Sequence, residues 1–558
     1  MRKREHAVGS AWSKTLACTD APCTGTGRSL HRPVAQAKGP QREGDEPNPM
    51  MHEGEKSDSA KVARKPANKT GQPVAELVER RVGAEGNTIQ DGMHRTPSRG
   101  SMSHGLDRVR TAARLDKRMR FTALLHHVNA DLLRDAYSWL KRDAASGVDG
   151  VTWHAYGEGL EERLKDLHAR VHRGTYRAQP SLRRYIPKSD GRQRPLGIAA
   201  LEDKIVQRAL AEVLNAIYEE DFLGFSYGFR PGRSQHDGLD ALTVGIECTA
   251  VNWVLDADIA GFFDTVSHEW LIRFLEHRIG DPRVIRLIRK WLKAGVTEDG
   301  QTTPTTVGTP QGAVISPLLA NIYLHYVFDL WAQQWRQRHA QGNVIFVRYA
   351  DDIVAGFEHK ADAERFLAEM RARMELFALR LHPEKTRLIE FGRHAATERK
   401  RRGEGKPETF AFLGFTHICG KSRRGHFRLS RKTRRDRMRV KLAAIKQEMR
   451  WRLHASIPEQ GSWLRQVMTG YFAYHAVPTN TQALTAFRYH VSRLWLRSLR
   501  RRSQKAAITW HQLAQLQAQW LPTPRILHPW PRERFAVKHP RWEPYALIGH
   551  VRICAGGA

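Results

Sequence analysis

Two short runs of apolar residues near the middle of the chain are separated by a turn that ends in two acids. Residues 344–347 and 353–357 have the length and the β-branched and aromatic content of strands. Tyr349-Ala350-Asp351-Asp352 lies between them, so the pattern predicts a β-hairpin with both carboxylates at its tip. A third run at residues 251–255 predicts another strand, which leads directly into an acidic segment.

Longer stretches carry apolar residues at helical spacing. Residues 121–140 predict a helix, which a turn-forming segment at 145–150 ends. Residues 421–502 predict further helices, in which four apolar residues share one face: Met438, Leu442, Ile445 and Met449. Residues 1–115 are polar, rich in Gly, Pro, Ser and charge, and lack such a pattern, which predicts that they are largely disordered.

The adjacent acids at the hairpin tip repel each other, and this needs a physical explanation. Divalent cations relieve such repulsion, and phosphoryl transfer uses two of them roughly 3.5–4 Å apart. Asp also favours ordinary turns, so Asp351 and Asp352 alone leave a structural interpretation open. A third carboxylate is available where Asp256 and Asp258 share one face of the preceding strand. The pattern leaves open which of these two reaches the hairpin tip.

The balance of charge indicates a polyanionic partner. The 558 residues include 91 Lys and Arg against 58 Asp and Glu, a net charge of +33. This favours nucleic acid, although ribosomal and membrane-surface proteins have similar compositions. Fourteen of the cations lie in residues 421–452 with only two acids, Asp436 and Glu448, which predicts a basic helix face against nucleic acid.

Other features argue against several classes of protein. There is no run of 18 or more apolar residues, so no membrane span is expected. The basic start lacks the apolar segment of a secretory signal. The 5 cysteines form no Cys-x-x-Cys pair, so neither a zinc site nor a disulfide framework is expected, and a reducing cytoplasm fits.

The acidic motifs belong to a series of segments whose order resembles that of the group II intron-encoded reverse transcriptases. Residues 258–268 (DIAGFFDTVSH) resemble the first catalytic block of that family, and residues 349–352 resemble its YADD block. The resemblance extends over about residues 118–535 and includes further segments in the family's order: 184–198, 226–234, 308–321, 381–386 and 412–417.

By this resemblance the chain has the α+β fold of a right-hand polymerase with an antiparallel palm sheet. Four regions are expected: a disordered basic extension at 1–115, fingers and palm at 116–420, a helical thumb and maturase (X) domain at 421–510, and a tail at 511–558. The tail has no endonuclease block, which resembles the endonuclease-lacking bacterial class. The resemblance makes Asp258, Asp351 and Asp352 the catalytic residues and the ligands of two Mg²⁺ ions, with Asp264 as a structural acid.

The resemblance also implies contacts to the incoming nucleotide, from Lys188, Arg194, Phe263, Gln311 and Lys385. Lys188 and Arg194 flank a turn and suit a triphosphate, although a solvated basic hairpin has the same pattern. Gln311 lies in a Gly- and Pro-bounded turn, where the backbone can approach a nucleotide closely. Phe263 would exclude a ribose 2′-hydroxyl; Phe262 is the rival candidate, and core packing is an alternative for both. Lys385 would stabilise the primer end or the active-site turn, or is an ordinary surface lysine.

The region after residue 421 resembles the maturase domain through residues 463–478 and 495–504. Aromatic residues interleaved with cations suit structured RNA, through stacking and phosphate contacts. The residues expected to bind RNA are Arg431, Lys432, Arg434, Arg435, Tyr471 and Tyr474. Helical core packing is the alternative for the two tyrosines.

The function implied is RNA-directed DNA synthesis together with binding of a group II intron RNA, which assists splicing and intron mobility. The expected partners are the intron RNA, a DNA target and primer, and deoxynucleoside triphosphates. Two alternatives remain: a splicing maturase without polymerase activity, and a non-mobile bacterial reverse transcriptase used in phage defence. The intact set of Asp258, Asp351 and Asp352 argues against the first, and the X-type segments argue against the second.

Overall fold

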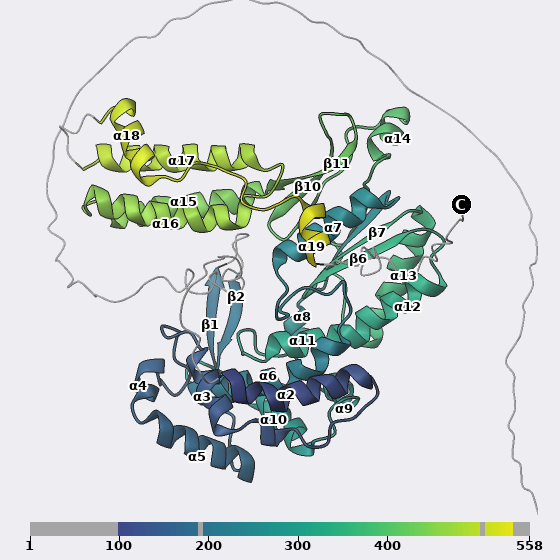
Figure 1. Cartoon of the computed structure of the whole chain (residues 1–558), viewed down its shortest axis with the longest axis vertical. Coiled ribbons are helices and arrows are strands. Elements are labelled where there is room, and N and C mark those ends of the chain that lie inside the picture. Colours follow the sequence, from purple (N-terminus) through teal and green to yellow (C-terminus); the bar gives the residue numbers. More distant parts are fainter. Residues whose placement is uncertain (1–98, 188–192, 503–507, 539–558) are drawn as a thin grey trace, which may run out of the picture. The chain divides into compact units, whose positions relative to one another are not determined.

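A computed structural model describes residues 99–187, 193–502 and 508–538 (Figure 1). The chain divides into two units, Met1–Lys69 and Thr70–Ala558, and every described residue lies in the second. That unit combines helices with three β-sheets, which confirms a fold of mixed helix and sheet.

The central sheet is antiparallel and four-stranded, with strand order β6-β7-β3-β8. Its strands are β3 (Trp253–Asp258), β6 (Val344–Tyr349), β7 (Asp352–Phe357) and β8 (Arg387–Glu390). The predicted hairpin is therefore confirmed, and the strand predicted at 251–255 is present but displaced towards Asp258.

Side chains of the central sheet alternate between two cores, as strand geometry requires. Phe346 and Ala355 belong to the larger core, which includes side chains of α11, α12 and α13. Ile345 and Val354 belong to a second core, which includes side chains of α7. These helices are α7 (Gln235–Cys248), α11 (Ser316–Leu324), α12 (Leu330–Arg338) and α13 (Lys360–Leu376), and a short π-helix, η2 (His325–Asp329), joins α11 to α12.

The larger core also includes side chains from elements before β3 and from helices between β3 and β6. Helix α6 (Leu201–Asp221) is buried along most of its length and packs against α2 (Arg99–Leu115) and α3 (Ala130–Ser138). Strands β1 (Ser181–Pro187) and β2 (Gln193–Ile198) form an antiparallel hairpin. The remaining elements of this part are η1 (Leu125–His127), α4 (Trp153–Gly157), α5 (Leu160–Arg173), α8 (Phe262–Thr265), α9 (His268–Glu276), α10 (Pro282–Lys293), β4 (Val296–Glu298) and β5 (Gln301–Thr303).

The prediction of disorder up to residue 115 is wrong for residues 99–115, which form α2; residues 1–98 lie outside the described part. Leu106, Val109 and Ala113 give α2 an apolar stripe at helical spacing, and this stripe packs into the larger core. The stripe is short and lies among charged residues, so the polar composition of the segment hides it.

The helix predicted over residues 121–140 is only partly correct. Phe121 pairs with Ile279 in an isolated β-bridge, and the α-helical part begins at Ala130. The Asn129 side chain accepts a hydrogen bond from the backbone N–H of Leu132, so it caps a new helix instead of continuing an old one.

The C-terminal part contains a second antiparallel sheet and a helical layer with its own core. Strands β9 (Phe410–Phe412), β10 (Phe415–Lys421) and β11 (Phe427–Thr433) form the sheet, with β10 in the middle. The helices are α14 (Ala395–Arg401), α15 (Arg435–Trp451), α16 (Ile457–His475), α17 (Thr481–Arg500), α18 (Trp510–Trp520) and α19 (Pro531–Lys538). Helix α19 packs against α7.

The helical prediction for residues 421–502 holds from Arg435 onward and is wrong for 421–433, which contain β11. In α15, Ile445 and Met449 are buried, and Met438 and Leu442 pack against the same core, as their spacing predicts. In β11 the buried residues alternate instead: Leu429, Arg431 and Thr433. A buried arginine in that series conceals the two-residue period of a strand.

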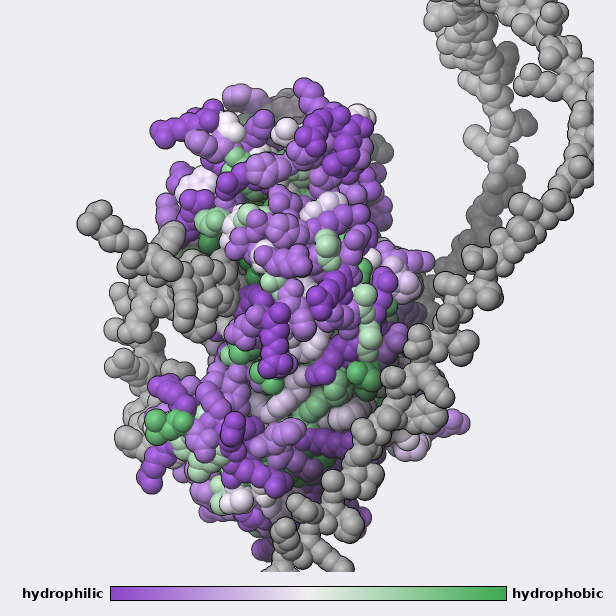
Figure 2. Space-filling view, turned by 90° about the vertical axis from the view of Figure 1, so that its right-hand side faces the viewer, coloured by the Kyte–Doolittle hydropathy of each residue, from purple (hydrophilic) through white to green (hydrophobic). Residues whose placement is uncertain are grey.

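The face shown in Figure 2 is predominantly hydrophilic, with hydrophobic residues in small separate groups. No helix among the described residues is long and apolar enough to cross a membrane.

Candidate active site

The hairpin β6–β7 ends in a two-residue turn, Ala350-Asp351, because Tyr349 pairs directly with Asp352. Ala350 has a left-handed backbone (φ +56°), which short hairpin turns require but which residues other than glycine rarely adopt. Asp258, the last residue of β3, pairs with Asp352. Three aspartates therefore meet at one end of the central sheet: Asp258, Asp351 and Asp352.

The register also answers which acid of β3 reaches the hairpin tip. Asp256 pairs with Val354, two positions further from the turn, and its carboxylate lies 3.8 Å from Arg387. Burial raises the pKa of Asp256 to about 6, and the Arg387 charge opposes that rise. Asp258 is therefore the third acid of the site, as the family resemblance implies.

The electrostatics of the site disfavour three ionised carboxylates. Burial, together with the charges of Asp351 and Asp258, raises the pKa of Asp352 to about 7. Asp352 nevertheless keeps a solvent-exposed surface. Burial likewise raises the pKa of Asp351, and nearby Lys385 and Arg194 oppose that rise.

Lys385 places a positive charge beside these carboxylates, since its Nζ lies 2.6 Å from Asp258 Oδ2. Among the residues that the structure describes, no group of three His, Cys, Asp or Glu side chains is arranged to hold a metal ion as it stands. Carboxylate oxygens are nevertheless the ligands that hard divalent cations prefer, and a cation relieves the repulsion that, after burial, contributes to the raised pKa of Asp352. The donor set thus fits a divalent cation, provided that Lys385 releases Asp258.

A glycine-containing loop connects the β1–β2 hairpin to the segment after β3. The N–H of Gly197 in β2 donates to the carbonyl of Gln311 at 2.7 Å, and the N–H of Thr309 donates to the carbonyl of Phe263 at 2.7 Å. A side chain at Gly312 (φ +113°) would place its Cβ 2.8 Å from the Gly197 carbonyl oxygen, so only glycine permits this close approach.

The predicted nucleotide-contacting residues are placed as follows. The loop brings Gln311, Phe263 and the strand that carries Arg194 together, and the charge of Arg194 influences Asp351. Phe262 is 2% exposed and belongs to the core, whereas its rival Phe263 is only partly buried. Lys188 lies outside the described residues.

The predicted RNA-binding residues separate into buried and exposed groups. Arg431 is 1% exposed and forms an ion pair with Asp240 at 2.8 Å. A residue that binds RNA must reach the surface, and Arg431 does not. Tyr471 stacks on Phe487 with ring centroids 3.6 Å apart, and the Tyr474 hydroxyl donates to the Leu413 carbonyl at 2.7 Å. Both tyrosines are thus packed as the core alternative expects. The other three are the exposed Lys432 and Arg435, and Arg434, which forms an ion pair with Asp436.

Sequence reasoning missed a buried polar network that contacts the Ala350-Asp351 turn. Its members are Arg348, Asp329, Asn321 and Ser226. The available signal was an arginine inside an otherwise apolar strand, which requires a buried partner.

Comparison with known proteins places the chain in a family. The family described as reverse transcriptase (RNA-dependent DNA polymerase) matches residues 186–417, which include all three aspartates. Protein YkfC of Escherichia coli is 36% identical over 313 residues, covering 51% of this chain and 78% of YkfC.

Relatives encoded in introns are also similar. The group II intron-encoded protein LtrA of Lactococcus lactis is 39% identical over 207 residues, and an uncharacterised 91 kDa protein in the cob intron of Schizosaccharomyces pombe is 38% identical over 199 residues. These matches cover 37% and 36% of this chain but only 34% and 24% of the two relatives. The chain belongs to the reverse transcriptase family and, within it, to the group II intron-encoded reverse transcriptases and maturases.

Proposed function

We propose that the chain copies RNA into DNA at the end of the central sheet where Asp258, Asp351 and Asp352 meet. The observation that carries this proposal is the register that sets Asp258 opposite Asp352, with Asp351 in the adjoining turn. Under this proposal the central sheet is the palm of a right-hand polymerase. The β1–β2 hairpin belongs to the fingers, and helices α15–α18 form the thumb and maturase domain.

The reaction is attack of a primer 3′-hydroxyl on the α-phosphate of a deoxynucleoside triphosphate, with pyrophosphate as the leaving group. Asp258, Asp351 and Asp352 would hold two Mg²⁺ ions. When bound, these ions lower the pKa of the hydroxyl and neutralise charge on the phosphates. The chain's own contribution is to hold three carboxylates on one rigid edge, so that little rearrangement is needed during the reaction.

Other side chains would bind and orient the nucleotide. Arg194 suits the triphosphate because Arg offers a fork of donors, and Lys188, which lies outside the described residues, would add a point charge. Lys385 becomes free to contact a phosphate or the primer end once Asp258 no longer pairs with it. Phe263 is the aromatic residue available to pack under the sugar, and Gln311 adjoins it through the Thr309–Phe263 hydrogen bond.

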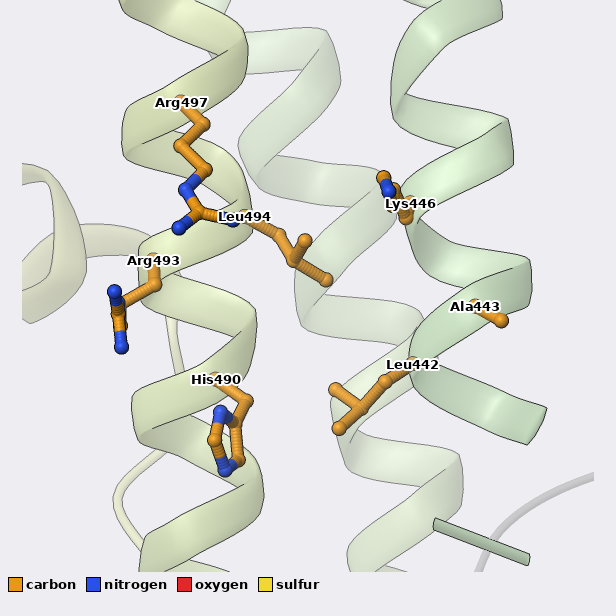
Figure 3. A pocket seen from close by; sticks show the side chains of 7 residues that line it. All are labelled: Leu442, Ala443, Lys446, His490, Arg493, Leu494 and Arg497. Atoms are coloured by element: carbon orange, nitrogen blue, oxygen red, sulfur yellow. The ribbon is translucent and has the colours of Figure 1, made fainter. Parts of the chain in front are cut away.

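A second part of the proposal is that the C-terminal helices bind intron RNA to assist splicing and mobility. The supporting observation is a groove of about 270 Å³ between α15 and α17 (Figure 3). Its floor is apolar and its side chains include the exposed cations Lys446, Arg493 and Arg497. Such a surface suits the charged backbone of a nucleic acid.

Primer extension on an RNA template tests the polymerase. The experiment compares the wild-type chain, Asp352→Ala and a control, Asp256→Asn, which changes the acid of β3 that pairs with Val354, two positions further from the turn than Asp258. We expect Asp352→Ala to lose about a thousandfold in rate, roughly 4 kcal/mol of transition-state stabilisation, and Asp256→Asn to lose less than about tenfold. A folded wild-type chain that binds intron RNA but extends no primer would instead support a splicing maturase without polymerase activity.

A further inference from the structure

Arg348 is the last but one residue of β6 and is completely buried, two positions before the catalytic turn. Its guanidinium donates to both carboxylate oxygens of Asp329, from Nε at 2.7 Å and from Nη2 at 2.6 Å. Both side chains are 0% exposed. The two-pronged geometry fixes the plane of the guanidinium, because both parallel bonds must be satisfied together.

The remaining donors of Arg348 reach three other segments. Nη1 donates to the carbonyl oxygen of Ala350 at 3.1 Å and to Asn321 Oδ1 at 3.0 Å, and Nη2 donates to Ser226 Oγ at 2.7 Å. Asn321 in turn donates to the Gly228 carbonyl at 2.7 Å. One planar group thus connects the catalytic turn to α11, η2 and the segment at 225–230.

The turn that Arg348 contacts has a residue with a left-handed backbone conformation and packs closely against the backbone of Gly228. Ala350 adopts φ +56° without being glycine, and it immediately precedes Asp351. A Cβ on Gly228 would lie within contact distance of the Ala350 nitrogen, so the turn rests directly on the Gly228 backbone. The N–H of Tyr227 also donates to the Arg348 carbonyl at 2.8 Å, which joins the same two segments. A strained turn persists only where its surroundings hold it in place.

We infer that Arg348, fixed by Asp329, is a positioning residue that holds the Ala350-Asp351 turn so that its carboxylates can bind divalent cations. This inference rests on the proposed role of Asp351 and Asp352 as metal ligands. Arg348 touches neither substrate nor metal; it acts through the Ala350 carbonyl. Residues that orient metal ligands in this way usually change metal affinity or activity by about 10–100-fold when they are replaced.

A buried ion pair elsewhere provides a matched control. Arg278 is 2% exposed, pairs with Asp221 at 2.9 Å and donates to the carbonyls of Asp116 and Met119. Its chemistry therefore repeats that of Arg348: a buried guanidinium, one aspartate and backbone acceptors. Its backbone acceptors lie in the last turn of α2 and just after that helix, and none of them belongs to the catalytic turn.

The test compares Arg348→Lys with Arg278→Lys in the full chain. Lysine keeps the charge but cannot satisfy Asp329 and the Ala350 carbonyl in one plane. For Arg348→Lys we expect the Mg²⁺ concentration for half-maximal primer extension to rise about tenfold and kcat at saturating Mg²⁺ to fall about tenfold or more. The KM for the deoxynucleotide should change less than about threefold, because the nucleotide contacts are intact.

Direct metal binding provides a measurement that does not depend on activity. Mn²⁺ should raise the melting temperature of the wild-type chain and of Arg278→Lys, and should raise that of Arg348→Lys much less at the same concentration. Ser226→Ala removes a single acceptor of Arg348 and keeps the Asp329 pair, so it should fold even if Arg348→Lys does not. We expect Ser226→Ala to shift the Mg²⁺ requirement in the same direction by about threefold, less than the usual 10–100-fold loss of an orienting residue.

The inference is overturned if Ser226→Ala and any folded Arg348→Lys keep wild-type Mg²⁺ dependence and Mn²⁺ stabilisation, with only their melting temperatures lowered like that of Arg278→Lys. Failure of the proposed function has a different signature. In that case Asp352→Ala would extend primers as well as the wild type, or would respond to Mn²⁺ as the wild type does.

Discussion

Arg348 and its partner Asp329 are both inaccessible to solvent, whereas the cations of α15 and α17 are exposed along a groove. The first arrangement connects four backbone segments to one another through a single side chain. The second leaves Lys446, Arg493 and Arg497 exposed in the part of the chain that the structure describes. Basic side chains thus connect segments inside the protein in one region and are exposed to solvent in the other.

The difference has a physical consequence that experiments can detect. A buried pair is protected from salt, and loss of one partner leaves the other charge uncompensated. Exposed cations contribute little to folding, yet each one that contacts a phosphate makes nucleic-acid binding depend on salt. Substitutions in the two regions should therefore separate stability from RNA affinity.

The largest expected effect is on the buried pair. Asp329→Ala leaves the Arg348 charge without its partner at zero exposure, and we expect the free energy of unfolding to fall by about 3–5 kcal/mol. Urea unfolding followed by circular dichroism measures this change. The control is Glu364→Ala, which breaks a pair with Lys360 whose side chains are both 56% exposed, and it should cost less than about 0.5 kcal/mol. Equal losses in the two variants would contradict the distinction between buried and exposed pairs.

Two neighbours in β11 make the same comparison within one strand. Arg431 is buried against Asp240, and Lys432 is exposed. We expect Arg431→Met to cost about 2 kcal/mol of unfolding free energy, less than a fully broken pair because Arg534 still lies 3.0 Å from Asp240. Lys432→Met should leave stability within about 0.5 kcal/mol.

Intron RNA binding by the same two variants decides which residue faces the RNA. If Arg431→Met lowered RNA affinity more than Lys432→Met, with stability unchanged, then the burial of Arg431 would not describe its role in solution.

The exposed groove should show the opposite behaviour. Arg493→Gln combined with Arg497→Gln should leave the free energy of unfolding within about 1 kcal/mol, since both side chains are exposed. We expect RNA affinity to fall about tenfold, and the slope of log affinity against log salt to become shallower by about 0.7–0.9 for each phosphate that the variant no longer neutralises. Filter binding at several salt concentrations measures both. Unchanged salt dependence would mean that the groove does not bind RNA.

The sequence predicted those parts of the site that depend on the order of apolar and polar residues within a few positions of one another. The apolar runs on both sides of Tyr349-Ala350-Asp351-Asp352 predicted β6 and β7, because a two-residue turn between two such runs restricts the backbone strongly. Pattern alone could not choose between Asp256 and Asp258, because that choice depends on pairing between β3 and β7, which lie about a hundred residues apart.

Features that depend on distant partners were the ones that pattern missed. Arg431 looked like a surface cation because its acid, Asp240, is 191 residues away in sequence. Arg348 was overlooked although a charged residue inside an apolar strand requires a buried partner. In both cases the missing information was the position of one aspartate: Asp240 on α7, and Asp329 at the end of η2, 19 residues before Arg348.

The smallest expected effect concerns a histidine directly opposite Arg431. His417 pairs with Arg431 across β10 and β11 and is 0% exposed; burial, together with the Arg431 charge, lowers its pKa to about 3. A folded-state pKa below the unfolded value of about 6.5 means that, near pH 6, the unfolded chain gains this proton and the folded chain does not. The contribution of His417 to stability is therefore complete well above pH 6.5 and declines as the pH falls, by about 1 kcal/mol between pH 6.5 and 5.5.

His417→Phe, which can keep the stacking on Phe410, should flatten the pH dependence of the unfolding free energy by about one proton over this range, whereas His490→Phe at the exposed groove should not. Urea unfolding at pH 7.5, 6.5 and 5.5 measures the slopes, and an unchanged slope in His417→Phe would show that His417 gains its proton equally in the folded and unfolded chains.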